Sequence, residues 1–221
     1  MVEEFISFAE LLWNLPLFDD LFLSMQGQNV MLVDLYLRDL ERDLLRELIE
    51  IERTPFPATL VVSALSQMWI FAVYELLRTW RQRVKDLKRD AQKPAVAQQS
   101  GHSKLAGMYY QGQLAHLRKK PTYAKELDRA VGRMDPLFRR IEALRMNLAK
   151  HEVPKLHGVP AMAPGYGRID GICGSISWQV DLGNNLVDLV SRRSLADQLK
   201  DLVVDKSVAR AAKRTKIKAK R

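Results

Sequence analysis

The sequence contains a single cysteine and only four histidines among its 221 residues. One thiol cannot close a disulfide within the chain, so we expect no disulfide scaffold and a reducing, cytoplasmic compartment. Neither a CxxC pair nor the two histidines of a zinc-protease helix occur. We therefore expect no metal ion and no cofactor; the residues concerned are His102, His116, His151, His157 and Cys173.

Motifs that bind nucleotide phosphates or activate a serine are also absent. The sequence has no GxxxxGK(S/T) loop and no GxSxG elbow, so P-loop ATP hydrolysis and serine hydrolase chemistry have no support. The closely spaced glycines from Gly165 to Gly171 follow a proline-rich loop and precede an expected strand. No helix N-terminus is therefore expected there to bind a pyrophosphate.

Signals for export or membrane insertion are lacking as well. Acidic residues occupy the first positions, where a secretory or mitochondrial signal carries Lys or Arg. The most apolar stretch, Leu60 to Leu77, has the length of a short membrane span but contains Gln67 and Glu75. Because an isolated carboxylate is costly in hydrocarbon, we expect a buried bundle helix and no membrane partner.

The net charge of +9 is distributed unevenly along the chain. Residues 1–53 carry 4 basic and 12 acidic side chains, residues 54–205 carry 23 and 14, and residues 206–221 carry 8 and none. Such a dipolar chain attracts a polyanion or another copy of itself.

Two long amphipathic helices are expected in the first half. Between Val30 and Arg53, leucines recur three and four residues apart and charged residues fill the gaps. Residues 54–57 contain two prolines and interrupt this pattern, and a run free of Gly and Pro then extends from Ala58 to about Asp90. Two long helices joined by a short turn predict an antiparallel hairpin.

Further helices are expected after a flexible connection at residues 92–104. One spans Leu105–Lys119, and another starts after Pro121. The pair Asp135-Pro136 supplies an N-cap and a first-turn proline, so we expect a separate helix from there to about Glu152.

The pattern changes beyond residue 152. Residues 153–171 are rich in Pro and Gly and indicate a linker. Apolar residues then alternate with polar ones, which predicts a half-buried strand with Ile172, Ile176, Trp178 and Val180 on its buried face. A turn and the segment Leu186–Val190 complete a hairpin that should pack its Trp178 face on the helices.

A short helix should follow the hairpin. Ser194 and Asp197 form a capping-box-like start for it. Residues 206–221 have few apolar side chains, and we expect them to be disordered when alone. The expected fold class is therefore mainly α: an antiparallel helical bundle (1–152), a Pro/Gly linker (153–171), a β-hairpin plus short helix packed on the bundle (172–205) and a disordered basic tail (206–221).

Polar residues border the buried stripe of the helix that should end near residue 152. Arg145 and His151 each lie about 60° from Leu148 on a helical wheel, one on each side. Asn147 stands four residues before His151, close enough to orient the imidazole. Arginine neutralises phosphate and histidine titrates near neutrality, which suits metal-free phosphodiester chemistry. The alternative is that Arg145 only extends to solvent and His151 only interacts with the helix dipole.

The segment RMNLAKH, Arg145 to His151, resembles the motif of the HEPN superfamily of helical proteins, in which a histidine follows an arginine after four to six residues. The resemblance covers about residues 28–152. It implies a dimer that unites two motifs in one cleft, and a metal-independent ribonuclease of the kind found in toxin–antitoxin or antiphage-defence systems. It makes Arg145 the phosphate-binding residue and His151 the acid/base. Met146 departs from the family, where a polar residue often follows the arginine.

Two functions are expected as alternatives. The first is a HEPN-like endoribonuclease or RNA-binding protein that forms a homodimer. The second is a non-catalytic helical scaffold whose acidic helix 30–53 binds a protein partner or its own basic body. In both, the tail contacts the backbone of a nucleic acid. The tail residues concerned are Lys206, Arg210, Lys213, Arg214, Lys216, Lys218, Lys220 and Arg221.

The remaining polar and aromatic residues receive a structural interpretation. Arg78 is the expected intrahelical partner of Glu75. Arg192 and Arg193 are expected to be a solvated pair, with phosphate contact as the alternative. Aromatic side chains can stack on bases, but at helical spacing we expect them to fill a core; they are Trp69, Trp80, Tyr109 and Tyr110.

Overall fold

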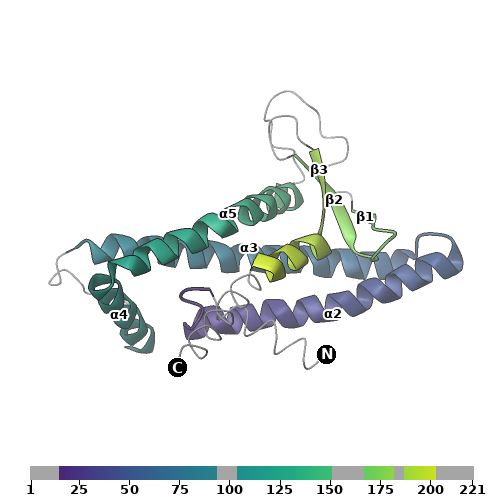
Figure 1. Ribbon diagram of the computed structural model, residues 1–221. Coiled ribbons are helices and arrows are strands. Elements are labelled where there is room, and N and C mark those ends of the chain that lie inside the picture. Colours follow the sequence, from purple (N-terminus) through teal and green to yellow (C-terminus); the bar gives the residue numbers. More distant parts are fainter. Residues whose placement is uncertain (1–14, 94–103, 151–166, 182–186, 203–221) are drawn as a thin grey trace, which may run out of the picture.

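The computed structural model describes residues 15–93, 104–150, 167–181 and 187–202. Within these ranges the protein is mainly α-helical, with a small antiparallel sheet near the C-terminal end (Figure 1). The expected fold class, a helical bundle followed by a hairpin and a short helix, is confirmed. The expected hairpin turn, most of the Pro/Gly linker and the basic tail lie outside the described residues.

The two longest helices, α2 (Leu21–Ile51) and α3 (Phe56–Ala91), form the expected antiparallel hairpin (Figure 1). α2 begins before Val30 because Asp20 caps it. The Asp20 carboxylate accepts hydrogen bonds of 3.0 Å from two backbone N–H groups of the first turn. The leucines of the predicted stripe explain the pairing, since Leu37 and Leu44 are fully buried.

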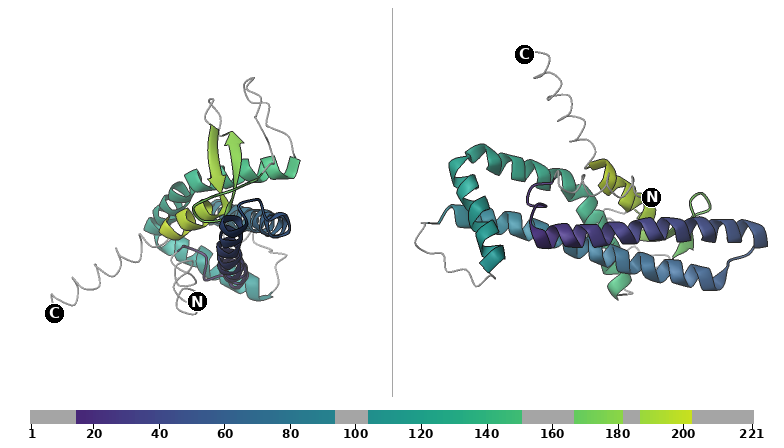
Figure 2. Two further views of the ribbon diagram at one scale, coloured as in Figure 1. Left: turned by 90° about the vertical axis from the view of Figure 1, so that its right-hand side faces the viewer. Right: turned by 90° about the horizontal axis from the view of Figure 1, so that it is seen from below.

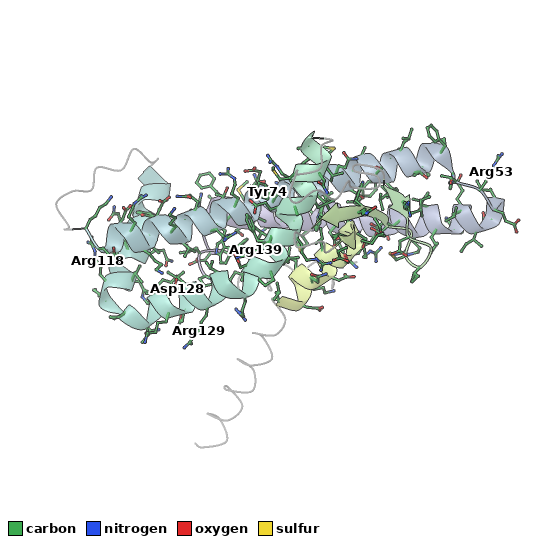
Figure 3. All side chains as sticks on the ribbon, turned by 90° about the horizontal axis from the view of Figure 1, so that it is seen from above. Arg53, Tyr74, Arg118, Asp128, Arg129 and Arg139 are labelled. Atoms are coloured by element: carbon green, nitrogen blue, oxygen red, sulfur yellow. The ribbon has the colours of Figure 1, made fainter. Side chains whose placement is uncertain are left out.

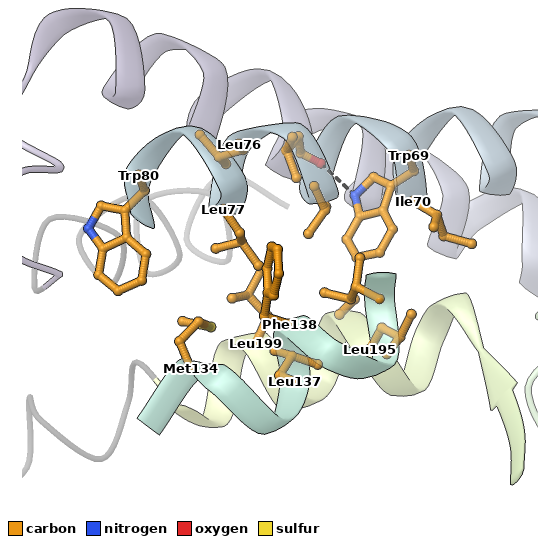
Figure 4. Packing of buried hydrophobic residues seen from close by; sticks show 14 of the residues in the cluster. Trp69, Ile70, Leu76, Leu77, Trp80, Met134, Leu137, Phe138, Leu195 and Leu199 are labelled. Atoms are coloured by element: carbon orange, nitrogen blue, oxygen red, sulfur yellow. Dashed lines mark hydrogen bonds between the residues drawn. The ribbon is translucent and has the colours of Figure 1, made fainter. Parts of the chain in front are cut away.

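α3 lies at the centre of the structure and contacts α2, α4, α5 and β2. Trp69 and Trp80 fill the core, as expected, and their indole N–H groups donate to the backbone carbonyls of Val30 (2.9 Å) and Pro16 (2.8 Å). Side chains from α5 and from the helix of residues 192–202 meet this face of α3 (Figure 4); those labelled are Met134, Leu137, Phe138, Leu195 and Leu199.

α3 is also the one described helix that is long and apolar enough to cross a membrane by length and composition. A core helix of a soluble protein passes the same test, and α3 buries Ile70, Val73 and Leu77 completely within the bundle. Glu75 forms the expected ion pair with Arg78 on the exposed side, at 2.7 Å. α3 is therefore a core helix of the described bundle.

α4 (Lys104–Lys119) agrees with the third expected helix, but α5 runs without a break over Pro121–Lys150. The prediction of a separate helix starting at Asp135 is wrong. Asp135 pairs instead with Arg81 of α3 (2.7 Å) and with Arg139 (2.9 Å). Apolar residues pack in the core on both sides of Pro136, which keeps the two halves in one helix although proline removes a backbone hydrogen bond. Figure 3 shows α5 turning near Arg139, as expected of a helix with an internal proline.

The sheet has the strand order β1-β2-β3, with β1 (Arg168–Ile169), β2 (Ile176–Asp181) and β3 (Val187–Ser191) all antiparallel. β2 and β3 form the expected hairpin, in which Trp178 pairs with Val190. The two-residue strand β1 was not predicted, because it is too short to show an alternating pattern.

The burial of β2 differs from the prediction in two respects. Ile172 is 90% exposed, because it lies in the turn before the strand and not within it. Trp178 and Val180 are buried as expected and β2 contacts α3 and α5, but Ser175 and Ser177 on the opposite face are buried too. The strand is therefore covered on both faces. The prediction is correct for the face with Trp178 and wrong for the opposite face, which was expected to be exposed.

The helix of residues 192–202 starts one turn earlier than expected. Ser191 caps it: its hydroxyl oxygen accepts a hydrogen bond from the Ser194 N–H at 2.9 Å. The prediction of a capping box between Ser194 and Asp197 is therefore wrong. Asp197 instead accepts a hydrogen bond from Arg38 of α2 at 2.5 Å, since α2 lies beside this helix.

Candidate functional site

Arg145 lies near the end of α5 and is half-buried. Its guanidinium carbon stands 5.0 Å from the ring centroid of Tyr74 in α3, within the range of a cation–π contact. Its Nη1 atom lies 3.7 Å from the sulfur of Met146. No carboxylate among the described residues forms an ion pair with Arg145.

Tyr74 supports Arg145 because its own ring is fixed by two neighbours. The Tyr74 hydroxyl donates to Glu142 of α5 at 3.4 Å, and its ring stacks on Phe138 with centroids 5.5 Å apart. Burial and the nearby Glu142 carboxylate raise the pKa of Tyr74, while Arg145 acts in the opposite direction. The phenol therefore stays neutral near pH 7, and its ring face is available to the guanidinium.

Asn147 is buried and joins α5 to the sheet. Its Nδ2 atom donates to the backbone carbonyl of Gln179 in β2 at 3.4 Å, and its Oδ1 atom has no hydrogen-bond partner in the described part of the chain. His151 lies outside the described residues, as do all eight predicted tail residues. The structure thus places Arg145 and Asn147 on one helix, and the predicted contact between Asn147 and His151 lies outside the described residues.

A groove of about 440 Å³ lies between α3 and α5 and extends to Phe138, which is joined to Arg145 through the Tyr74 ring. Four cationic side chains of α3 line it together with Phe138, the ring on which Tyr74 stacks. Figure 3 draws the side chains of the two helices and labels Tyr74 of α3 and Asp128 of α5. The four cations, Arg78, Arg81, Lys85 and Lys88, define what we call the α3–α5 groove.

A second group of charges is buried and was missed in the sequence. Arg192 is completely buried, and its Nε and Nη2 atoms donate to Glu41 of α2 at 2.7–2.9 Å. Its Nη1 atom donates to Asp34, and Arg193 also donates to Glu41, at 2.8 Å. The prediction of a solvated Arg192-Arg193 pair is therefore wrong. We call Asp34, Glu41, Arg192 and Arg193 the buried charge cluster.

The buried charge cluster attaches the sheet and the helix of residues 192–202 to α2. A buried ion needs oppositely charged partners, and Arg192 has two. Gly174, in the turn before β2, approaches the same point of α2: its φ is 72°, and a Cβ atom there would overlap the backbone carbonyl of Glu41. The carboxylates of Asp34 and Glu41 are thus used inside the chain and are closed to another protein.

One sequence feature was able to reveal this cluster. Asp34 and Glu41 are seven residues apart, which places them on the same side of α2 as the buried Val30 and Leu37. Acidic residues within an apolar stripe require buried cations. The sequence does not indicate that the cation comes from a position more than 150 residues away.

Tyr109 and Tyr110 of α4 are held by carboxylates. The Tyr109 hydroxyl donates to Asp19, and the Tyr110 hydroxyl donates to Asp90 at 2.8 Å. Burial and these carboxylates raise the pKa of both phenols. The two side chains therefore connect α4 to its neighbours.

In the described ranges, no group of three or more His, Cys, Asp or Glu side chains could hold a metal ion. Comparisons with protein-family models, with curated proteins and with solved structures find no match to this chain. Its function is therefore argued from its own residues.

Proposed function

We propose that the protein is an RNA-binding, metal-independent endoribonuclease of the HEPN type. The observation that carries the proposal is the state of Arg145: it is fixed against Tyr74, half-buried and without an acidic partner in the described part of the chain. Apart from Nη1, which lies 3.7 Å from the Met146 sulfur, the donors of this guanidinium have no acceptor among the described residues and can bind a phosphate.

The charge around Arg145 favours a polyanionic substrate. Residues 104–150, which form α4 and α5, contain 11 basic and 4 acidic side chains. α2 has the opposite balance, with 3 basic and 6 acidic side chains. Such a surface attracts nucleic acid from a distance and leaves the choice of substrate to the residues at the site.

The proposed reaction uses the RNA itself as nucleophile. The ribose 2′-hydroxyl attacks the adjacent phosphate, His151 moves the proton, and Arg145 stabilises the negative charge that develops on the phosphorane. The leaving 5′-oxygen takes up a proton, and a cyclic phosphate remains on the other product. In the proposed homodimer two such motifs share one cleft, in the cytoplasm of a cell that uses the protein as a toxin or in antiphage defence.

Cleavage of a labelled RNA in EDTA tests this mechanism. We expect Arg145→Ala and His151→Ala each to reduce the cleavage rate by about 100-fold or more, because each removes a group that acts in the transition state. Arg139→Ala is the matched control, since Arg139 is an exposed arginine of the same helix. Activity that survives both substitutions, or an inactive wild-type protein, contradicts the proposal.

The basic tail makes a separate contribution. Deletion of residues 206–221 removes eight positive charges, so we expect a large loss of RNA affinity and a weaker salt dependence. The circular dichroism spectrum and the unfolding midpoint should stay unchanged, because the tail sequence has few apolar side chains to bury. A tail-deleted protein that unfolds earlier would contradict this separation.

A different observation favours the alternative, a non-catalytic scaffold. The outer side of α2 carries six large apolar side chains, each 38–58% exposed, and no charged residue occurs between Leu21 and Val33. They fall within an arc of about 120°, opposite the buried stripe. Viewed from below, α2 is the nearest described element (Figure 2). The residues of this outer face are Leu21, Phe22, Met25, Leu32, Val33 and Tyr36.

An exposed apolar face of this kind is typical of a surface that binds another protein chain. The scaffold hypothesis predicts that Leu32→Glu abolishes self-association or partner binding in sedimentation experiments and leaves RNA cleavage by the remaining monomer at background. Glu47→Gln, at an exposed position of the same helix, is the control. Association that is unchanged in Leu32→Glu excludes this face as the interface.

A further inference from the structure

We infer that the α3–α5 groove binds the phosphodiester backbone of single-stranded RNA and leads it to Arg145. This inference rests on the proposed RNA-binding function and names the surface that performs it. Its basis is the alignment of four cations, the weakness of their present ion pairs and the continuous ring contacts that join the groove to Arg145.

The cations of the groove lie on one side of α3. At about 100° per residue, Tyr74, Arg78, Arg81, Lys85 and Lys88 fall within an arc of about 80°. From the first to the last of them the helix rises by about 21 Å. The same side chains that line the groove therefore form a row that ends beside the ring carrying Arg145.

Lys85 is the cation most available to a ligand. It is exposed, and no ion pair or hydrogen bond joins it to another described residue. Its positive charge is therefore not neutralised by the protein. A phosphate in the groove can therefore pair with the Lys85 ammonium group without displacing another partner.

Two further cations hold acids that a phosphate can replace at low cost. Arg78 pairs with Glu75 and Lys88 with Asp128, and all four side chains are at least 36% exposed. Exposed ion pairs contribute little to stability, so exchanging a carboxylate for a phosphate group is inexpensive. These ion pairs reduce the repulsion between neighbouring cations of the groove. They do not block the access of a phosphate.

Arg81 differs, because it fixes the position of the groove. Its guanidinium carbon lies 4.1 Å from the Phe138 ring centroid, and Nη2 lies 2.7 Å from Asp135. Phe138 stacks on Tyr74, and Tyr74 carries Arg145. Arg81, Phe138, Tyr74 and Arg145 thus form an unbroken series of contacts from the groove to the proposed reaction centre.

The groove fits a backbone better than a base. Its lining offers four cationic side chains, the carboxylate of Asp128 paired with Lys88, and one amide, Gln82. The rest of the lining is apolar, from Val84, Val131 and Phe138. Phosphate contacts of this kind position a strand and carry no sequence information. A flexible single strand can follow such a row of cations, and its affinity should fall steeply with salt.

Fluorescence anisotropy of a labelled oligouridylate with the full-length protein tests the inference. We expect Lys85→Glu to weaken binding by about tenfold or more and to lower the slope of log K against log salt by about 1. Lys125→Glu makes the same charge change at an exposed position of α5 outside the groove, and should weaken binding by less than about threefold. Equal unfolding midpoints of the two variants show that folding is not the cause.

The outcomes separate the inference from the function on which it rests. If the wild-type protein binds RNA and the two lysine variants lose affinity equally, the groove is excluded and the proposed function stands. If the wild-type protein does not bind RNA, both fail. An oligothymidylate should lose the same factor in Lys85→Glu; a loss on RNA alone would show a contact to ribose or base and overturn the assignment to the backbone.

Cleavage kinetics give a second, independent readout. Lys85→Ala should raise KM several-fold with kcat unchanged, because a contact made equally in the ground state and the transition state affects binding only. Arg145→Ala should lower kcat. A fall in kcat for Lys85→Ala would contradict a role in backbone binding.

Discussion

The protein uses arginine and lysine in two opposite environments, the buried charge cluster on α2 and the α3–α5 groove. Arg192 is fully buried and makes four hydrogen bonds to two carboxylates. Lys85 is exposed and has no partner among the residues that the structure describes. In the buried charge cluster the positive charge therefore attaches one part of the chain to another. In the α3–α5 groove the same charge stays available to a ligand.

The difference follows from desolvation. A buried cation must recover its lost hydration through ion pairs, and removing it leaves buried carboxylates without compensation. An exposed cation stays hydrated, and removing it changes the surface potential with little effect on folding. Stability and RNA affinity should thus respond to substitutions at different sites, and the following variants test this separation in order of decreasing effect on stability.

Arg192→Met should destabilise the protein most, by about 3–5 kcal/mol, because Asp34 and Glu41 lose a buried partner. Urea unfolding followed by circular dichroism measures the change. The double variant Arg192→Met, Glu41→Gln should recover part of the loss, since one uncompensated charge is then gone. A loss below about 1 kcal/mol in the single variant would show that Arg192 is hydrated in solution.

Gly174→Ala should destabilise the protein by about 2 kcal/mol or more. A left-handed backbone costs about 1–2 kcal/mol for an L-residue, and the new methyl group also overlaps the carbonyl of Glu41. Gly112→Ala in α4 is the control: nothing lies near its Cβ position, so this variant should be more stable than wild type by up to about 1 kcal/mol. Thermal unfolding of the two variants should therefore shift in opposite directions.

Arg81→Ala should have an intermediate effect of about 1 kcal/mol. It removes a half-buried ion pair with Asp135 and the contact with the Phe138 ring. Urea unfolding gives the value, and Arg139→Ala, which removes an exposed partner of the same carboxylate, should cost less. Equal losses in both variants would show that the ring contact adds nothing.

Lys85→Ala should leave stability within about 0.5 kcal/mol of wild type, because no described partner is lost. The same variant should still reduce RNA affinity. A protein in which Lys85→Ala unfolds readily would remove the contrast between the groove and the buried charge cluster, since the groove cation would then also serve folding.

The sequence was a good guide where structure depends on local pattern. The stripe around Leu37 and Leu44 and the prolines before Ala58 were enough to predict the α2–α3 hairpin, because helix periodicity is carried by neighbouring residues. The Trp178 face of β2 was also predicted correctly, since alternation shows directly which side is buried.

It was a poor guide where distant contacts override local preference. Asp135-Pro136 has the composition of a helix start, yet packing on α3 keeps Pro136 inside α5. Arg192 stands in a polar segment that suggests solvent, and only the approach of α2 buries it. In the candidate site, Arg145 was predicted from the helix wheel, whereas its support by Tyr74 depends on how α3 and α5 cross.

The turn that precedes β2 carries a thiol whose reactivity depends on whether the turn contacts α2. Cys173, the one thiol of the chain, lies beside Gly174, where the turn meets α2, and burial raises its pKa. Alkylation at neutral pH should therefore be slow while the turn stays on α2 and faster whenever it separates. Because Cys173 is partly exposed, the rate of labelling at this single position, measured by mass spectrometry with and without urea, would show how far separation of the turn from α2 adds to the reactivity of the folded protein.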